Sequence, residues 1–133
     1  MQLKILDQTF AILKLPPTDP IPSWAWQGEV FSVTRTDEEL SIVCPSECLP
    51  DNERFEYLEK DWKCLKVEGI LDFTQTGILS SLAKPLADNR ISIFAVSTYN
   101  TDYLLIKSRF MDQARAVLEK EGHTFCKERS PRA

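Results

Sequence analysis

The fold is decided by residues 62–126, which read WKCLKVEGILDFTQTGILSSLAKPLADNRISIFAVSTYNTDYLLIKSRFMDQARAVLEKEGHTFC. Short apolar runs alternate here with two segments in which apolar residues recur every three or four positions, a spacing typical of amphipathic helices. The pattern predicts strands at 62–67, 91–97, 102–107 and 124–126, and helices at 77–87 and between Ser108 and Gly122. The order strand, helix, strand, strand, helix, strand is that of the ferredoxin-like fold, an α+β fold in which an antiparallel sheet carries helices on one face.

Two details of this stretch refine the prediction. Residues 91–97 are almost continuously apolar, which predicts a strand buried on both faces. Pro85 lies inside the first predicted helix, and because proline has no backbone N–H we expect it to kink or tighten the last turn.

The first half of the chain follows a similar order of strands. Strands are predicted at 9–15, 30–34 and 40–44, with a short strand or turn at 55–58. The position of the first helix is occupied by four prolines within residues 16–22, so this half is interpreted as a degenerate copy of the same unit. The predicted organisation is a first unit at 1–60, a second at 61–127 and a flexible tail at 128–133.

Trp24 and Trp26 follow the prolines. Two tryptophans one residue apart share a side of a strand or flank a short turn, and we expect core or lid packing for them rather than ligand stacking.

Charge and hydropathy exclude several classes of protein. The chain has 16 basic and 20 acidic residues, a net charge of −4 and a pI of about 5.0, whereas a nucleic-acid domain usually carries a basic face. The most apolar window, residues 91–96, is far shorter than the roughly 20 residues of a membrane span. No signal peptide is recognised at the start. We therefore expect a cytoplasmic protein that contacts neither nucleic acid nor membrane.

The four cysteines are weak metal candidates. Zinc usually takes four ligands in two close pairs, but only Cys44 and Cys48 are close in sequence, and Cys64 and Cys126 stand alone. The single histidine is His123. We expect reduced thiols, no metal and no cofactor.

The sequence contains no recognisable catalytic motif. The four glycines are scattered and form no phosphate loop, and His123 follows a helix stop, where a structural role is usual. The paired carboxylates lie in predicted loops or on solvated helix faces. A non-enzymatic protein is the better interpretation.

Two polar segments favour a ligand-binding function. Residues 72–78 lead from a strand into a helix, whose first amides lack partners and suit a carboxylate, while Gly77 permits close approach of a ligand to the backbone. The alternative is an ordinary helix capped by Thr74 or Thr76. The second segment, 97–102, places six polar residues between two apolar strands. Its Asp102 either receives a cationic group or simply caps the turn.

These segments resemble a known family. The similar stretches are LKVEG at 65–69, LDF at 71–73, TGIL at 76–79 and ISIFAVSTYNTDYLL at 91–105, with LSIVCP at 40–45. They look like the small tandem ACT-domain proteins, in particular the subgroup that contains the CASTOR-type amino-acid sensors.

The resemblance implies two tandem ACT units, no catalysis, and a free amino acid bound between paired units. By motif position it assigns ligand binding to Gly77, Ile78, Ser97, Thr98, Asn100 and Asp102. Because open sheet edges need covering, we also expect a homodimer or larger closed assembly, which acts on a regulated protein partner. The alternative is an interaction module that has kept the fold and lost the ligand.

Overall fold

The computed structural model describes residues 1–72 and 76–126, and its chain divides into two compact units. The first unit is Gln8–Trp62, and the second combines Met1–Asp7 with the chain from Lys63 onward. The division after Trp62 lies close to the expected boundary at residue 60, but residues 1–7 belong with the second unit and not with the first. The expected tail at 128–133 lies outside the described residues.

Among the described residues, the second unit contains two α-helices and five strands. They are β1 (Gln2–Ile5), the end of β5 (Tyr57–Val67), α1 (Ile78–Asp88), β6 (Phe94–Ser97), β7 (Asp102–Lys107), the short 3-10 helix η3 (Ser108–Phe110), α2 (Met111–Lys120) and β8 (Thr124–Phe125). Strand β5 pairs with β7, and β7 pairs with β6. Strand β1 lies between β5 and β8, antiparallel to β5 and parallel to β8. Without β1, this is the strand order of the predicted ferredoxin-like fold.

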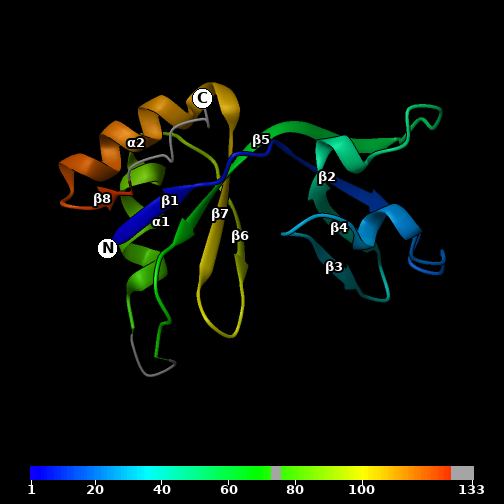
Figure 1. The fold of residues 1–133 in the computed structure, drawn as a ribbon, viewed down its shortest axis with the longest axis horizontal. Coiled ribbons are helices and arrows are strands. Elements are labelled where there is room, and N and C mark those ends of the chain that lie inside the picture. The colour runs from blue at the N-terminus through cyan, green and yellow to red at the C-terminus, as the bar shows by residue number, and fades with distance from the viewer. Residues whose placement is uncertain (73–75, 127–133) are drawn as a thin grey trace, which may run out of the picture. The chain divides into compact units, whose positions relative to one another are not determined.

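Both helices pack on one face of this sheet, side by side (Figure 1). The alternation of apolar residues along the strands turns one side of each strand toward the helices. The core consists of Leu3, Leu65, Val67, Leu104 and Ile106 from the strands, with Leu82, Leu86, Met111, Ala114 and Leu118 from the helices, joined by Ile91. Each fully buried leucine or isoleucine stabilises the fold by about 1.5–3 kcal/mol.

The first unit keeps the same strand order without α-helices. Its elements are β2 (Phe10–Leu15), η1 (Ser23–Trp26), β3 (Ser32–Arg35), β4 (Leu40–Pro45), η2 (Ser46–Cys48) and the start of β5. The strands are ordered β3-β4-β2-β5, all antiparallel. Short 3-10 helices occupy both helix positions, so the prediction of two ferredoxin-like units with a degenerate first unit is confirmed.

The two tryptophans of η1 have different surroundings. Trp24 packs against the core of the first unit and meets the Phe55 ring edge-on, with centroids 5.6 Å apart. Trp26 is 53% exposed and meets only the edge of Phe31. Of the expected core or lid packing, the core position therefore holds for Trp24 and not for Trp26, because residues two apart on a tight helix turn point in different directions.

The prediction for residues 91–97 is wrong in two respects. Only Phe94–Ser97 form a strand, because Ile91 is still bound to the end of α1, where its N–H donates to the Leu86 carbonyl at 2.9 Å. The strand is also not buried on both faces, since Ala95 and Ser97 are exposed. The apolar run combines two structures: Ile91 follows the end of α1 and packs in the core, whereas Phe94–Ser97 form a strand at the sheet edge.

Pro85 lies inside α1, as the sequence indicates, and it affects a distant residue. Because Pro85 has no N–H, the carbonyl of Ser81 loses its partner in the helix. The Nε2 atom of His123 lies 3.3 Å from that carbonyl oxygen, within hydrogen-bonding range. His123 is 8% exposed. The only histidine is thus placed to replace the bond that Pro85 removes.

We predict that His123→Ala lowers the free energy of unfolding by about 1–3 kcal/mol, since it leaves the Ser81 carbonyl without a donor. In a Pro85→Ala background the helix supplies that donor again, so the cost of His123→Ala should fall. Urea unfolding of the parent, both single variants and the double variant measures this coupling. Equal costs of His123→Ala in the two backgrounds would contradict the pairing.

Candidate functional site

The β6–β7 hairpin holds most of the predicted site residues. Ser97 and Asp102 are the cross-strand pair that closes the turn, and the Ser97 hydroxyl donates to Oδ1 of Asp102 at 2.5 Å. The turn itself is held by Thr98, whose N–H and hydroxyl both donate to the Thr101 carbonyl, at 2.8 and 3.0 Å. Asp102 thus takes part in closing the turn through its Oδ1, while within the described residues its Oδ2 accepts no hydrogen bond.

Thr101 fixes this hairpin to the rest of the second unit. It is 4% exposed, and its hydroxyl donates to the Val67 carbonyl at the end of β5, at 2.6 Å. The neighbouring Asn100 carbonyl accepts a bond from the Leu71 N–H at 2.7 Å. Thr101 is not among the predicted site residues, because nothing in the sequence distinguishes a buried hydroxyl from the other polar groups of residues 97–102.

The start of α1 forms the other side of the site. Gly77 precedes the helix, no side chain caps it, and Thr76 makes no cap bond; Thr74 lies outside the described residues. The first-turn N–H groups have no acceptor within the helix and carry partial positive charge. The Ser80 hydroxyl donates to the Gly77 carbonyl at 3.1 Å, so this bond does not involve the first-turn amides.

Gly77 is needed for its backbone conformation. Its φ is +78°, a region that side chains with a Cβ rarely adopt. A Cβ at this position would meet only the Ser80 hydroxyl, at 3.7 Å, an ordinary contact. The space around Gly77 is therefore open, the turn into α1 by itself requires a glycine here, and close approach of a ligand to this backbone stays a prediction.

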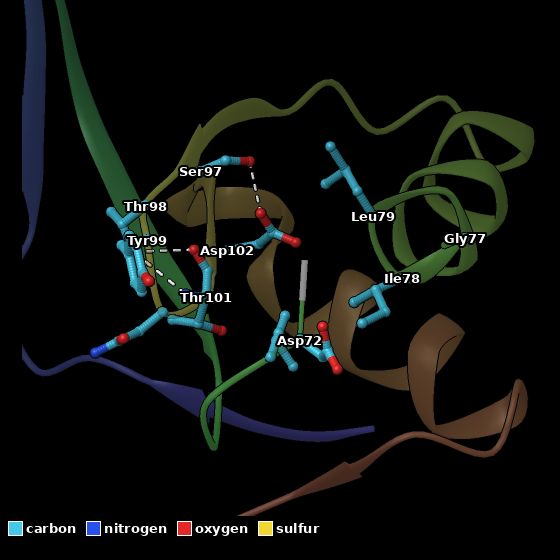
Figure 2. Close-up of a pocket in the computed structure, with 11 residues that line it drawn as sticks. Asp72, Gly77, Ile78, Leu79, Ser97, Thr98, Tyr99, Thr101 and Asp102 are labelled. Atoms are coloured by element: carbon cyan, nitrogen blue, oxygen red, sulfur yellow. Dashed lines mark hydrogen bonds between the residues drawn. The ribbon is translucent and has the colours of Figure 1, made fainter. Parts of the chain in front are cut away.

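The hairpin and the helix start enclose a pocket of about 290 Å³, shown in Figure 2. All six predicted binding residues line it: Gly77, Ile78, Ser97, Thr98, Asn100 and Asp102. The lining also contains Leu71, Asp72, Leu79, Tyr99 and Thr101. The side chains of Ile78, Leu79 and Asp102 occupy the space between the hairpin and the start of α1 (Figure 2). The volume is at the small end of the range for ligand sites and suits a molecule of amino-acid size.

The lining of this pocket is acidic. Two carboxylates, Asp72 and Asp102, contribute to it, and its described lining contains no lysine, arginine or histidine. The helix start supplies positive potential at one side only. The pocket therefore offers separate partners to an anionic group and to a cationic group.

The cysteines lie away from this pocket and carry no disulfide. Burial raises the pKa of Cys64 from 9.0 to about 12, and burial together with the nearby Cys48 thiol raises that of Cys44 to about 11. Across residues 1–72 and 76–126, no group of three histidine, cysteine, aspartate or glutamate side chains is arranged to hold a metal ion. Neither of the two described α-helices is long and apolar enough to cross a membrane.

We predict that iodoacetamide at pH 8 labels the partly exposed Cys48 and Cys126 before Cys44 and Cys64, since a thiol reacts as its thiolate. The raised pKa values of Cys44 and Cys64 mean that the folded state keeps both protons when the unfolded state starts to lose them. Their contribution to stability is thus complete below about pH 9 and disappears as the pH rises through 11 and 12. Peptide mapping of the labelled protein tests the predicted order of labelling, and early labelling of Cys64 would contradict that order.

Comparison with known proteins identifies the family. A model described as an ACT domain matches residues 57–120, and a model of an N-terminal domain matches residues 8–52. The crystal structure of protein Atu0741 from Agobacterium tumefaciens is 38% identical, with a TM-score of 0.88 over 99% of this chain and 96% of that one. The human protein CASTOR3P is 34% identical over 101 residues, 68% of this chain and 62% of that protein. This chain belongs to the small tandem ACT-domain proteins related to the CASTOR-type sensors.

A rat protein named cytosolic arginine sensor for mTORC1 subunit 1 is 29% identical over 102 residues, 71% of this chain. The chain spans 62% of the length of CASTOR3P and 31% of the rat sensor. The regulatory subunit of aspartate kinase from Thermus thermophilus shares the fold, with a TM-score of 0.61 at 9% identity over 88% of this chain and 96% of that one. The chain therefore contains an ACT domain and is related to a protein named as an arginine sensor.

Proposed function

We propose that this protein is a non-catalytic, cytosolic sensor that binds a free amino acid in the pocket of the second unit and acts on a regulated partner. One observation carries the proposal: an uncapped helix start and the Asp102 carboxylate lie on opposite sides of one pocket of about 290 Å³. An amino acid presents an anion and a cation on adjacent atoms, so it matches this arrangement. The relationship to proteins named as amino-acid sensors supports the same conclusion.

Each charged group of the ligand finds a partner. The α-carboxylate loses water on binding and requires donors, which the first-turn amides at Ile78 and Leu79 supply without further rearrangement. The α-ammonium requires acceptors, and Asp102 offers its Oδ2 atom beside the oxygens of Ser97 and Thr98. Charge-assisted bonds of this kind are about twice as strong as neutral ones.

The charges of the pocket also indicate which side chain the ligand carries. Asp72 and Asp102 would repel an acidic side chain, while a neutral or basic one is compatible with them. Arginine is the first amino acid to test, because the rat relative is named as an arginine sensor.

We predict that one amino acid, at about 100 times its Kd, adds roughly 2.7 kcal/mol to the free energy of unfolding. A thermal-shift screen of the twenty amino acids at millimolar concentration identifies it. Asp102→Ala should remove most of this gain and leave the ligand-free protein folded, because it deletes the acceptor of the ammonium group. The control is Asp7→Ala, which changes an exposed aspartate of the same unit.

Two results would contradict this site. A ligand that binds Asp102→Ala as well as the parent would show that the site lies elsewhere. If no amino acid stabilises the parent, the protein is an interaction module that has lost its ligand.

We also propose that the protein forms a homodimer through the edge of the second unit. Strand β6 pairs only with β7 among the described residues, so its other edge offers unpaired backbone groups. Such an edge is a template for a second strand, and soluble proteins normally cover it. A second copy of the chain covers both edges at once through a two-fold axis.

We predict that light scattering finds a dimer at micromolar concentration. Ala95→Lys places a charge on an exposed position of β6 and should give a monomer, because charges on an edge strand oppose pairing. Thr34→Lys is the matched control, since Thr34 is exposed on β3, the edge strand of the first unit. A dimer that dissociates with the Thr34 variant and persists with the Ala95 variant would place the interface on β3.

A further inference from the structure

The β3–β4 hairpin of the first unit repeats the β6–β7 hairpin of the second. Four residues separate the strands in both, 36–39 in one and 98–101 in the other. Thr36 and Thr98 occupy the same place, and the N–H of each donates to the carbonyl three residues on, at 2.9 and 2.8 Å. Each threonine hydroxyl also accepts a bond from the third following N–H, at 3.2 and 3.3 Å. The two turns therefore correspond residue by residue, although their sequences share little.

This correspondence assigns a counterpart to each hairpin residue of the candidate site. The closing pair Ser97 and Asp102 corresponds to Arg35 and Leu40, which form the closing pair of the first hairpin. Leu40 is fully buried in the core of the first unit. The first unit therefore lacks the carboxylate that Asp102 offers and has a long cationic side chain where the second unit has a small serine.

The Arg35 side chain crosses from the hairpin to the loop that follows β2. Its Nη2 donates to the Asp19 carbonyl at 2.7 Å, and its Nη1 donates to the Pro17 carbonyl. By strand order, this loop corresponds to the segment between β5 and α1, which lines the pocket of the second unit. The Arg35 side chain thus spans the same two elements that face each other across that pocket.

We propose that the first unit retains a closed copy of the ligand site, in which the Arg35 side chain takes the place of a ligand. The protein then binds one amino acid per chain, in the second unit, and not two. The number of ligands rests on the proposed function, whereas the closure by Arg35 does not.

The closure follows from the degenerate helix position. The prolines after β2 replace the helix start with a loop whose Pro17 and Asp19 carbonyls accept hydrogen bonds from Arg35. A carboxylate ligand would find acceptors there in place of donors. A guanidinium group is the suitable occupant, because its planar fork donates to two acceptors at once.

The experiment removes the side chain and then returns its head group. In Arg35→Ala, the Asp19 amide, which is bonded to the Pro16 carbonyl at 3.1 Å, should exchange with water about five- to tenfold faster by NMR. Millimolar n-propylguanidinium should restore the slow exchange, and n-propylammonium should not, since it lacks the planar fork. Amides of residues 97–102 should keep their parent rates.

The matched control is Arg54→Ala, which removes another exposed arginine of the first unit and should leave Asp19 exchange unchanged. Unchanged exchange in Arg35→Ala, or rescue by propylammonium as well, would overturn the closure. Equilibrium dialysis of the parent with L-arginine should give one ligand per chain, and two would overturn it as well. Absence of arginine binding would count against arginine as the ligand of the second unit and would leave the exchange result to decide the closure.

Discussion

Both units depend on the backbone hydrogen bonds of one strand. The first part of β5 pairs with β2 and completes the first unit, and the last part pairs with β1 and β7 in the second. Asp61, whose φ is +66°, lies within the register shift between the Phe10–Trp62 and Ile12–Glu59 pairs, and the change of partner follows between Trp62 and Leu65. A non-glycine residue in this conformation costs about 1–3 kcal/mol and persists only where its surroundings enforce it. Here the Ile12–Glu59 pair before Asp61 and the Phe10–Trp62 pair after it supply that constraint.

Strand β5 also holds the elements of the candidate site in place. The end of β5 accepts the Thr101 hydroxyl, and so fixes the hairpin that presents Ser97 and Asp102. The segment after β5 leads to the start of α1 and is tied to the hairpin through Leu71. The donors and acceptors of the proposed ligand site therefore lie on elements that are held by these bonds, an arrangement that would reduce the ordering entropy of the proposed binding.

Most elements of the second unit and its polar turn could be predicted from the sequence, because each is encoded by residues close together in the chain. Its helices follow a regular apolar spacing, and the polar turn at 97–102 interrupts two apolar strands. The features that were missed depend on tertiary partners. Strand β1 shows only the two apolar residues Leu3 and Ile5, and its place between β5 and β8 depends on residues 60 or more positions away. Likewise, local periodicity does not show that β6 lies at an edge or that His123 faces the helix break at Pro85.

The position of β1 has a consequence for the order of folding. All residues of the first unit lie between positions 8 and 62, so its strands can pair as soon as that part of the chain has been synthesised. The sheet of the second unit instead pairs Leu3 with Phe125, near the two ends of the described chain. Closing so long a loop costs entropy before any contact offsets it, and this slows folding. Until β8 emerges from the ribosome, one edge of β1 lacks its partner strand, and the nascent chain carries a folded first unit together with an incomplete second one.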